Sequence, residues 1–280
     1  MIIFSDMDGT FLDTRKRVGP AGWRALDALA AAGLEFVPCT GRPLSGIPAD
    51  VLAHPAVHYA VSSNGAVIAR LDGERPQDTS RATTLHLAGL SRAKAHEIWK
   101  IARDYDVTFD IFAGGDCYTQ RSMYDRLEEY VADPHIARAL RATRIPLEAT
   151  PEAIIDGARD LERVAIYWKD PVDRDAIRVR LAAVDGIEVT RSYSMNIEVM
   201  AAGTSKGSAL RWLCAELGTP ASEAVAFGDN MNDVSMLQIA GTGVAMQNAE
   251  DAVRAAADAV AASNDADGAS LFILDLLARA

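Results

Sequence analysis

Short apolar runs alternate with amphipathic segments at the start of the chain. Residues 2–4 predict a strand, and the helical spacing of apolar residues over 23–32, ended by Gly33, predicts a helix. Two more apolar runs, at 34–37 and 59–61, predict further strands, and each of the three strands is followed by polar residues. A strand–helix–strand order with polar residues at the carboxyl ends of the strands predicts a parallel α/β sheet.

The segment from residue 83 to residue 190 follows another pattern. Its strands lie close together in the sequence and are joined by Gly-Gly and Asp-Gly turns, which is typical of antiparallel pairing. The predicted elements are a helix at 91–105, a hairpin of 107–112 and 117–120, a helix at 122–131, a strand at 163–168, a helix at 172–183 and a strand at 187–190. We therefore expect an α+β module, with a proline-containing connection between residues 131 and 163.

The α/β pattern then resumes. The predicted elements are a helix at 206–217, strands at 224–227, 242–245 and 259–260, and a final helix at 271–277. The fold class expected is α/β, with a Rossmann-like parallel-sheet core and an inserted α+β cap domain. The core is discontinuous, formed by 1–82 and 191–280, and the cap spans 83–190.

Composition and charge limit the ligands. The 280 residues include 28 Lys and Arg against 39 Asp and Glu, a formal net charge of −11, which disfavours nucleic-acid binding driven by phosphate contacts. An anionic substrate would therefore need a local cationic site. Three cysteines without a CxxC pair, no apolar run long enough to span a bilayer and no basic leader favour a cytoplasmic protein.

The first chemical motif is Asp6-Met7-Asp8-Gly9-Thr10, directly after the first predicted strand. Asp6, at the strand end, has the fixed placement that a covalent nucleophile needs. Asp8 is placed to donate a proton to a leaving oxygen and later to accept one from water, while Gly9 allows a tight turn. On its own, the Asp-x-Asp pair is equally typical of an Asx turn that caps a helix.

Three more segments place polar side chains beside predicted elements. Thr40-Gly41-Arg42 follows the second strand, and Lys206 begins a predicted helix. Each of these alone is more typical of a turn or an exposed side chain. The run 228–233 contains two acidic residues four positions apart, Asp229 and Asp233. Their carboxylate oxygens suit Mg²⁺. The run alone is also typical of an N-capping loop.

Together these groups meet the needs of phosphoryl transfer. A carboxylate nucleophile and a phosphate repel each other, so attack requires neutralisation of charge. Mg²⁺ held by Asp6, the main-chain carbonyl of Asp8 and Asp229 would bridge nucleophile and phosphate. Lys206 and the groups near Thr40 would hold the remaining phosphoryl oxygens.

These motifs, in this order, resemble the four motifs of the haloacid dehalogenase superfamily. The placement of the insert, after Ser63–Ala66 and before Lys206, is similar to that in the Cof-like branch of sugar-phosphate phosphatases. The resemblance implies a Rossmann-like core with an α/β cap, catalysis through an aspartyl-phosphate on Asp6, and acid/base catalysis by Asp8. The second aspartate of the pair favours a phosphatase over a dehalogenase.

The same resemblance implies roles for the remaining residues. The metal ligands implied for Mg²⁺ are Asp6, Asp8, Asp229 and Asp233, the last in or just behind the metal shell. The implied phosphate- or substrate-binding residues are Thr40, Gly41, Arg42, Asn64, Lys206 and Asn232.

The function expected is that of a Mg²⁺-dependent phosphatase of small phosphorylated metabolites, sugar phosphates in particular. A phosphomutase or phosphotransferase would use the same intermediate. A non-catalytic phosphate-binding regulator is disfavoured, because Asp6, Asp8, Lys206 and Asp229 are all present. The expected partner is a small phosphate ester, with neither nucleic acid nor membrane involved, and the sequence defines no oligomeric state.

Overall fold

The computed structural model describes residues 1–279, which form two compact units. The core unit consists of 1–42, 47–86 and the chain from Ser205 onward, and the insert unit consists of 43–46 and 87–204. The insert unit thus continues past residue 190, where the sequence predicted its end. The reason is β11 (Asn196–Ala201), which pairs antiparallel with two strands of the insert sheet.

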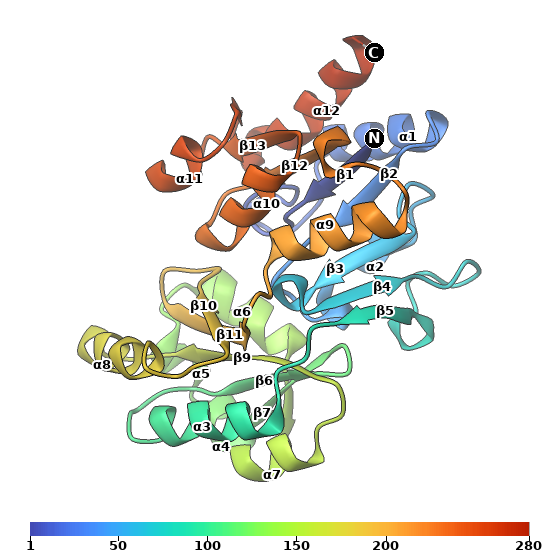
Figure 1. The fold of residues 1–280 in the computed structure, drawn as a ribbon. Coiled ribbons are helices and arrows are strands. Elements are labelled where there is room, and N and C mark those ends of the chain that lie inside the picture. Colours follow the sequence, from blue (N-terminus) through green and yellow to red (C-terminus); the bar gives the residue numbers. More distant parts are fainter. Residues whose placement is uncertain (280) are drawn as a thin grey trace. The chain divides into compact units, whose positions relative to one another are not determined.

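A parallel sheet forms the centre of the core unit (Figure 1). Ile3, Phe4, Ala226 and Phe227 are fully buried, as expected where helices cover both faces of a sheet. This confirms the α/β fold class predicted from the sequence. In spatial order the strands are β14 (Ala259–Ala261), β13 (Thr242–Met246), β12 (Ala224–Gly228), β1 (Ile2–Ser5) and β2 (Glu35–Pro38).

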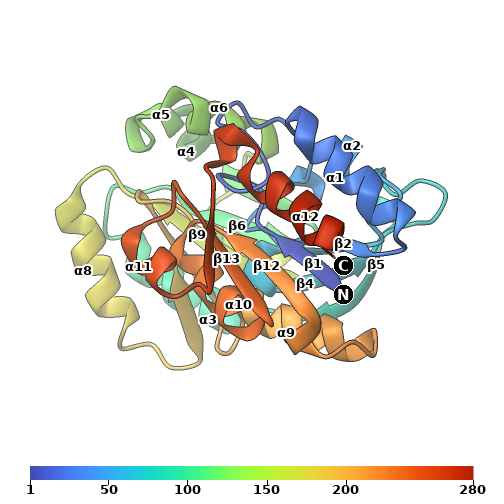
Figure 2. The same cartoon turned by 90° about the horizontal axis from the view of Figure 1, so that it is seen from above.

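Helices cover the two faces of this sheet (Figure 2). On one side α1 (Pro20–Ala31) packs against α12 (Gly268–Arg279), and on the other α9 (Lys206–Glu216) packs against α10 (Val234–Ile239). The remaining elements of the core unit are α2 (Ala49–Leu52), α11 (Asp251–Ala255) and a three-stranded sheet of β3 (Tyr59–Ser62), β4 (Val67–Arg70) and β5 (Thr83–Leu87).

The insert unit contains a second sheet, of order β10-β11-β9-β6-β7-β8. Its neighbouring strands are antiparallel except for β7 and β8, which are parallel. Ile111 and Val164 pack into an apolar cluster with α3 and α8, whereas Phe112 and Tyr167 pack into another with α5 and α6. The other bounds are β6 (Asp110–Ala113), β7 (Asp116–Gln120), β8 (Ile145–Leu147), β9 (Leu161–Tyr167), β10 (Ile187–Thr190), α3 (Arg92–Ala102), α4 (Arg121–Asp125), α5 (Leu127–Tyr130), α6 (Pro134–Thr143), α7 (Pro151–Gly157) and α8 (Pro171–Leu181).

Two sequence predictions for the insert unit are wrong. The helix predicted at 122–131 is interrupted at Arg126, whose φ of −98° and ψ of 12° are not helical, so α4 and α5 are separate. The connection after residue 131 contains two helices, α6 and α7. Both begin with a proline directly after a capping residue, Asp133 or Thr150. Proline in the first helical position favours a helix start and does not break the helix.

Two further sequence expectations concern membrane spans and thiols. None of the helices formed by residues 1–279 has the length and apolar character needed to cross a bilayer. Cys39, Cys117 and Cys214 are free thiols and all three are buried.

Candidate active site

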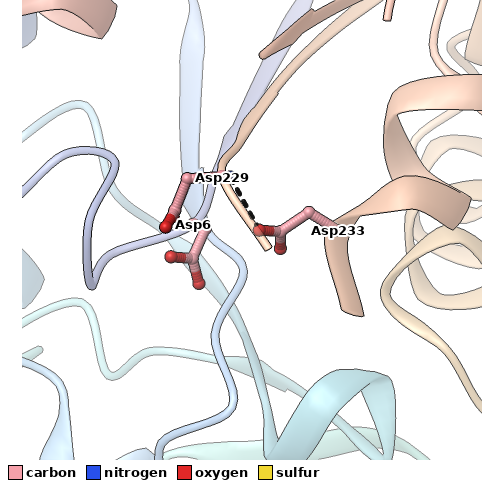
Figure 3. A group of neighbouring side chains, drawn as sticks. All are labelled: Asp6, Asp229 and Asp233. Carbon is pink, nitrogen blue, oxygen red and sulfur yellow. Dashed lines mark hydrogen bonds between the residues drawn. The ribbon is translucent and has the colours of Figure 1, made fainter. Parts of the chain in front are cut away.

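Three carboxylates converge at the carboxyl ends of the central strands of the core unit (Figure 3). Asp6 follows β1, and Asp229 follows β12. These strands are parallel neighbours with Ser5 opposite Phe227, so the residues after them leave the sheet side by side. One oxygen each from Asp6, Asp229 and Asp233 lies within 4.8 Å of the others.

Lys206 is the cation of this group. Its Nζ lies 2.5 Å from Oδ1 of Asp6 and 2.6 Å from Oδ1 of Asp233, and the side chain has no exposed surface. Lys206 is the first residue of α9, and a capping box between Ser205 and Ser208 fixes this helix end. Although burial opposes its charge, Asp233 and Asp6 hold the pKa of Lys206 above its ordinary value.

One tight backbone position and three hydrogen bonds bring the loops together. Gly9 has φ +87°, and a Cβ there would lie 2.5 Å from Oδ2 of Asp229. Thr10 Oγ1 donates a hydrogen bond to Oδ1 of Asp229 at 2.7 Å. The backbone amides of Asp229 and Asn230 both donate to Oδ2 of Asp233 at 2.9 Å, as the dashed line to Asp229 in Figure 3 shows. Asp233 therefore binds two partners, the ammonium of Lys206 through Oδ1 and the backbone of the loop through Oδ2.

The electrostatics of the group suit a bound cation. Burial raises the pKa of Asp6 to about 7 even though Lys206 opposes this shift, and burial with repulsion from Asp6 and Asp233 raises the pKa of Asp229 well above its usual value. Three carboxylates against one ammonium leave two excess negative charges when all are ionised. The donors are all oxygens, which hard divalent cations prefer. The group could thus hold a metal ion.

Asp8 lies outside this carboxylate group. Its side chain accepts a two-point interaction from Arg42, with Nε 2.6 Å from Oδ2 and Nη2 2.8 Å from Oδ1, and Lys16 Nζ lies 2.7 Å from Oδ1. Although burial opposes ionisation, Arg42 and Lys16 hold the pKa of Asp8 well below its usual range. Asp8 is therefore a carboxylate held by two cations.

The predicted substrate-side residues lie on neighbouring loops of the core unit. In the loop Thr40-Gly41-Arg42, the Thr40 hydroxyl accepts from the amide of Arg42 at 3.1 Å. The Thr40 carbonyl accepts from the amide of Asn64 at 3.0 Å. Asn64 in turn accepts a 2.9 Å hydrogen bond from Nδ2 of Asn232. The structure thus links four of the predicted phosphate-side residues, Thr40, Arg42, Asn64 and Asn232, in one chain of hydrogen bonds.

Sequence reasoning did not single out three residues that support the site. Lys16 pairs with Asp8, Thr10 bonds to Asp229, and Asn248 Nδ2 donates to the carbonyl of Gly9 at 2.8 Å. Thr10, to which no role was assigned, is the last residue of the first motif, and Lys16 was visible as a polar residue shortly after it. Asn248 follows β13 in the chain, so its strand-end position was the signal available for it.

The core unit is thus an α/β fold whose parallel sheet carries a buried lysine and a group of three carboxylates beside its strand ends. A family model of haloacid dehalogenase-like hydrolases matches residues 3–273, and the chain belongs to this family. The family resemblance stated from the four motifs is thereby confirmed.

Individual relatives cover nearly the whole chain. It is similar to phosphatase YwpJ of Bacillus subtilis (strain 168), 26% identical over 294 residues and covering 99% of each protein. It is also similar to pyridoxal phosphate phosphatase YbhA of Escherichia coli (strain K12), 28% identical over 281 residues and covering 97% of each. A solved haloacid dehalogenase-like hydrolase from B. subtilis matches with a TM-score of 0.82 and 26% identity, covering 98% of this chain and 99% of that one.

Proposed function

We propose that this hydrolase cleaves small phosphate monoesters, sugar phosphates among them, through a phosphorylated Asp6. The observation that carries the proposal is the buried Asp6 carboxylate at the end of β1, 2.5 Å from Lys206 and grouped with Asp229 and Asp233. Because Lys206 contacts Oδ1 of Asp6, the other oxygen is the one that attacks phosphorus. The phosphatase names of YwpJ and YbhA support the same chemistry.

The carboxylate group fits Mg²⁺ as the metal, with Asp6, Asp229, Asp233 and the main-chain carbonyl of Asp8 as the proposed ligands. When bound, Mg²⁺ supplies the positive charge that lets a carboxylate approach a phosphate dianion. Lys206 holds Asp6 in place and stabilises the negative charge that develops on the phosphoryl oxygens. Thr40, Gly41 and Asn232 are proposed to hold the remaining oxygens.

Leaving-group selectivity is proposed to reside in the insert unit, which acts as a cap. The residues proposed to carry out phosphoryl transfer all belong to the core unit and contact only the phosphoryl group and the metal, so they cannot distinguish one alcohol from another. Substitutions of polar insert residues should therefore change the ranking of substrates. Hydrolysis of a minimal aryl phosphate should stay within about tenfold, or ~1.4 kcal/mol of barrier.

The direct test is release of inorganic phosphate from sugar phosphates, pyridoxal 5′-phosphate and an aryl phosphate, with Mg²⁺ and no added acceptor. Release from at least one ester supports the proposal. Release only after a sugar acceptor is added would identify a phosphotransferase instead. No turnover under either condition would leave a phosphate-binding protein and contradict the proposal.

Replacing Asp8 by asparagine should trap phosphate on Asp6. Arg42 and Lys16 keep Asp8 ionised, so in the resting site it can accept the proton of the attacking water but has no proton to donate. An activated aryl phosphate has a good leaving group, so Asp8→Asn should still be phosphorylated by it but should lose water activation. Intact-mass spectrometry should then show the added phosphate. Wild-type turnover of alkyl phosphates by Asp8→Asn would rule out the assigned role.

Mg²⁺ should stabilise the fold, and more strongly at higher pH. The folded pKa of Asp6 is raised from 3.8 to about 7, so in metal-free protein its contribution to stability is present below pH 4 and is lost as the pH rises to about 7. The low pKa of Asp8 acts in the opposite sense, but its contribution is already complete above about pH 4. Mg²⁺ binds the ionised carboxylates, so it should restore stability, by about 2.7 kcal/mol at a hundredfold excess over Kd.

Urea unfolding at pH 5.0 and pH 7.5, with Mg²⁺ or a chelator, measures this effect. The matched variant is Asp229→Asn, which should lose most of the response to Mg²⁺. Equal unfolding free energies with and without Mg²⁺ at pH 7.5 would contradict the assignment of the metal site.

A further inference from the structure

Three consecutive residues with positive φ follow β3. The φ angles are +51° at Ser63, +59° at Asn64 and +95° at Gly65, and both non-glycine side chains are buried. Left-handed backbone is uncommon outside glycine, although asparagine adopts it more readily than most residues. Such a conformation costs about 1–3 kcal/mol per residue and persists where the surroundings fix it, often at functional sites.

The surroundings of this turn come from two other parts of the site. The amide of Ser63 donates to the carbonyl of Arg42 at 2.9 Å, and the amide of Asn64 donates to the carbonyl of Thr40 at 3.0 Å. On the other side, a Cβ on Gly65 would overlap the carbonyl oxygen of Ser205, so backbone meets backbone at the start of α9. In Figure 1, α9 lies beside the β3–β4 hairpin. The turn therefore joins the Thr40 loop to the helix that begins with Lys206.

The side chain of Asn64 makes a third connection. Its Oδ1 accepts a 2.9 Å hydrogen bond from Nδ2 of Asn232, which lies in the turn Met231–Asp233. Asn232 is 7% exposed, and its Oδ1 is buried without a hydrogen-bond partner among the described residues. Because a carboxamide is planar, a bond that fixes Nδ2 also fixes where Oδ1 and the second N–H point. An unsatisfied buried amide oxygen is costly, which indicates that a ligand or its solvent shell completes it.

We propose that Asn64 is a positioning residue for the phosphoryl site. Its left-handed backbone places the carboxamide that orients Asn232. The same turn hydrogen-bonds to the Thr40 loop and packs against the start of α9, so it fixes the positions of both. The inference rests on the proposed function, since the second N–H of Asn232 Nδ2 would donate to the phosphoryl group. Asn64 itself acts through Asn232 and does not touch the reacting atoms.

The test is a double-mutant cycle of Asn64→Gly, Asn232→Ala and the double variant. Glycine accepts the left-handed backbone without strain, so Asn64→Gly removes the carboxamide and leaves the turn intact. We expect kcat/KM to fall about tenfold or more, with a contribution from a higher KM, because a misplaced Asn232 holds the phosphoryl group of the bound ester less well. Binding of inorganic phosphate, measured by calorimetry, should weaken by a similar factor in both single variants. The double variant should have the same kcat/KM and phosphate affinity as Asn232→Ala alone, because Asn64 acts only through Asn232.

Two further variants separate positioning from folding. Asp160→Gly replaces another left-handed residue, in the insert unit, and measures what relief of a positive φ does to the thermal midpoint by itself. Asn64→Asp keeps both the acceptor oxygen and tolerance of the left-handed backbone, so it should retain more phosphate affinity than Asn64→Gly.

Wild-type kcat/KM and phosphate affinity in Asn64→Gly would overturn the inference. So would losses that multiply in the double variant, or a loss of activity that merely follows a lower thermal midpoint. Failure of the proposed function has a different signature, because wild-type protein would then release no phosphate from any ester. The phosphate-binding measurements still decide the role of Asn64 in that case.

Discussion

Asp6→Asn should abolish hydrolysis of every phosphate ester while the protein stays folded. Asparagine is nearly isosteric, but its amide is a poor nucleophile and lacks the charge that would hold Mg²⁺. Loss of a nucleophile typically lowers kcat on the order of 10⁴-fold or more. The fold itself should tolerate the change, because a raised pKa means that the ionised form of Asp6 is disfavoured in the folded protein.

Steady-state kinetics with Mg²⁺ measure the loss of activity, and thermal unfolding at pH 7.5 in a chelator measures the stability of the fold. We expect the thermal midpoint of Asp6→Asn to be equal to that of wild type or higher. Asp27→Asn, at an exposed position on α1 where the side chain is 76% exposed, is the matched control and should keep wild-type activity. More than a few per cent residual activity in Asp6→Asn with metal still bound would mean that Asp6 is not the nucleophile.

Lys206→Met should lower activity on all substrates by one common, large factor. Methionine keeps most of the buried volume but removes the only ammonium that contacts Asp6 and Asp233 within the described residues. Loss of one charged group from a preorganised site costs about 10²–10³-fold in kcat. The metal-free protein should also lose about 3–5 kcal/mol of unfolding free energy, because two buried carboxylates are left without their partner.

Comparing kcat/KM for several esters separates this effect from selectivity. Lys206→Ala should show the same uniform loss with a larger loss of stability, since it also leaves a cavity. Lys100→Met, at an exposed lysine on α3, is the control and should leave kcat/KM and the unfolding free energy unchanged. If Lys206→Met proved selective for one ester while insert variants lost all activities equally, the proposed division of labour would be refuted.

The convergence of Asp6, Lys206 and Asp229 could be predicted because parallel strands end at one edge of a sheet. The sequence spacing of Asp6 and Asp8 did not reveal that their side chains separate. Residue 8 lies in a loop that turns at Gly9, with φ +87°, so the alternation of a strand no longer sets its direction. Its partner Lys16 is itself left-handed, with φ +63°, and only the folded loop brings the two together.

The boundaries of the insert were harder to predict for a related reason. The core was predicted to resume at residue 191, which would place residues 196–201 in it. In the structure these residues form β11, a central strand between β10 and β9. Which sheet a strand joins depends on partners distant in the sequence, and hydrophobic periodicity carries no information about them.

The pairing of β1 with β12 has a consequence for synthesis of the chain on the ribosome. Ile2 lies opposite Ala224, so β1 emerges about 220 residues before its neighbour. At about 5–20 residues per second, this strand waits on the order of 10–40 s with one edge unpaired. All the residues of the insert unit leave the ribosome during that interval. The nascent chain therefore carries an apolar strand with an open edge, available to chaperones or to aggregation, and the nucleophile meets the rest of its site only after Asp233 has been synthesised.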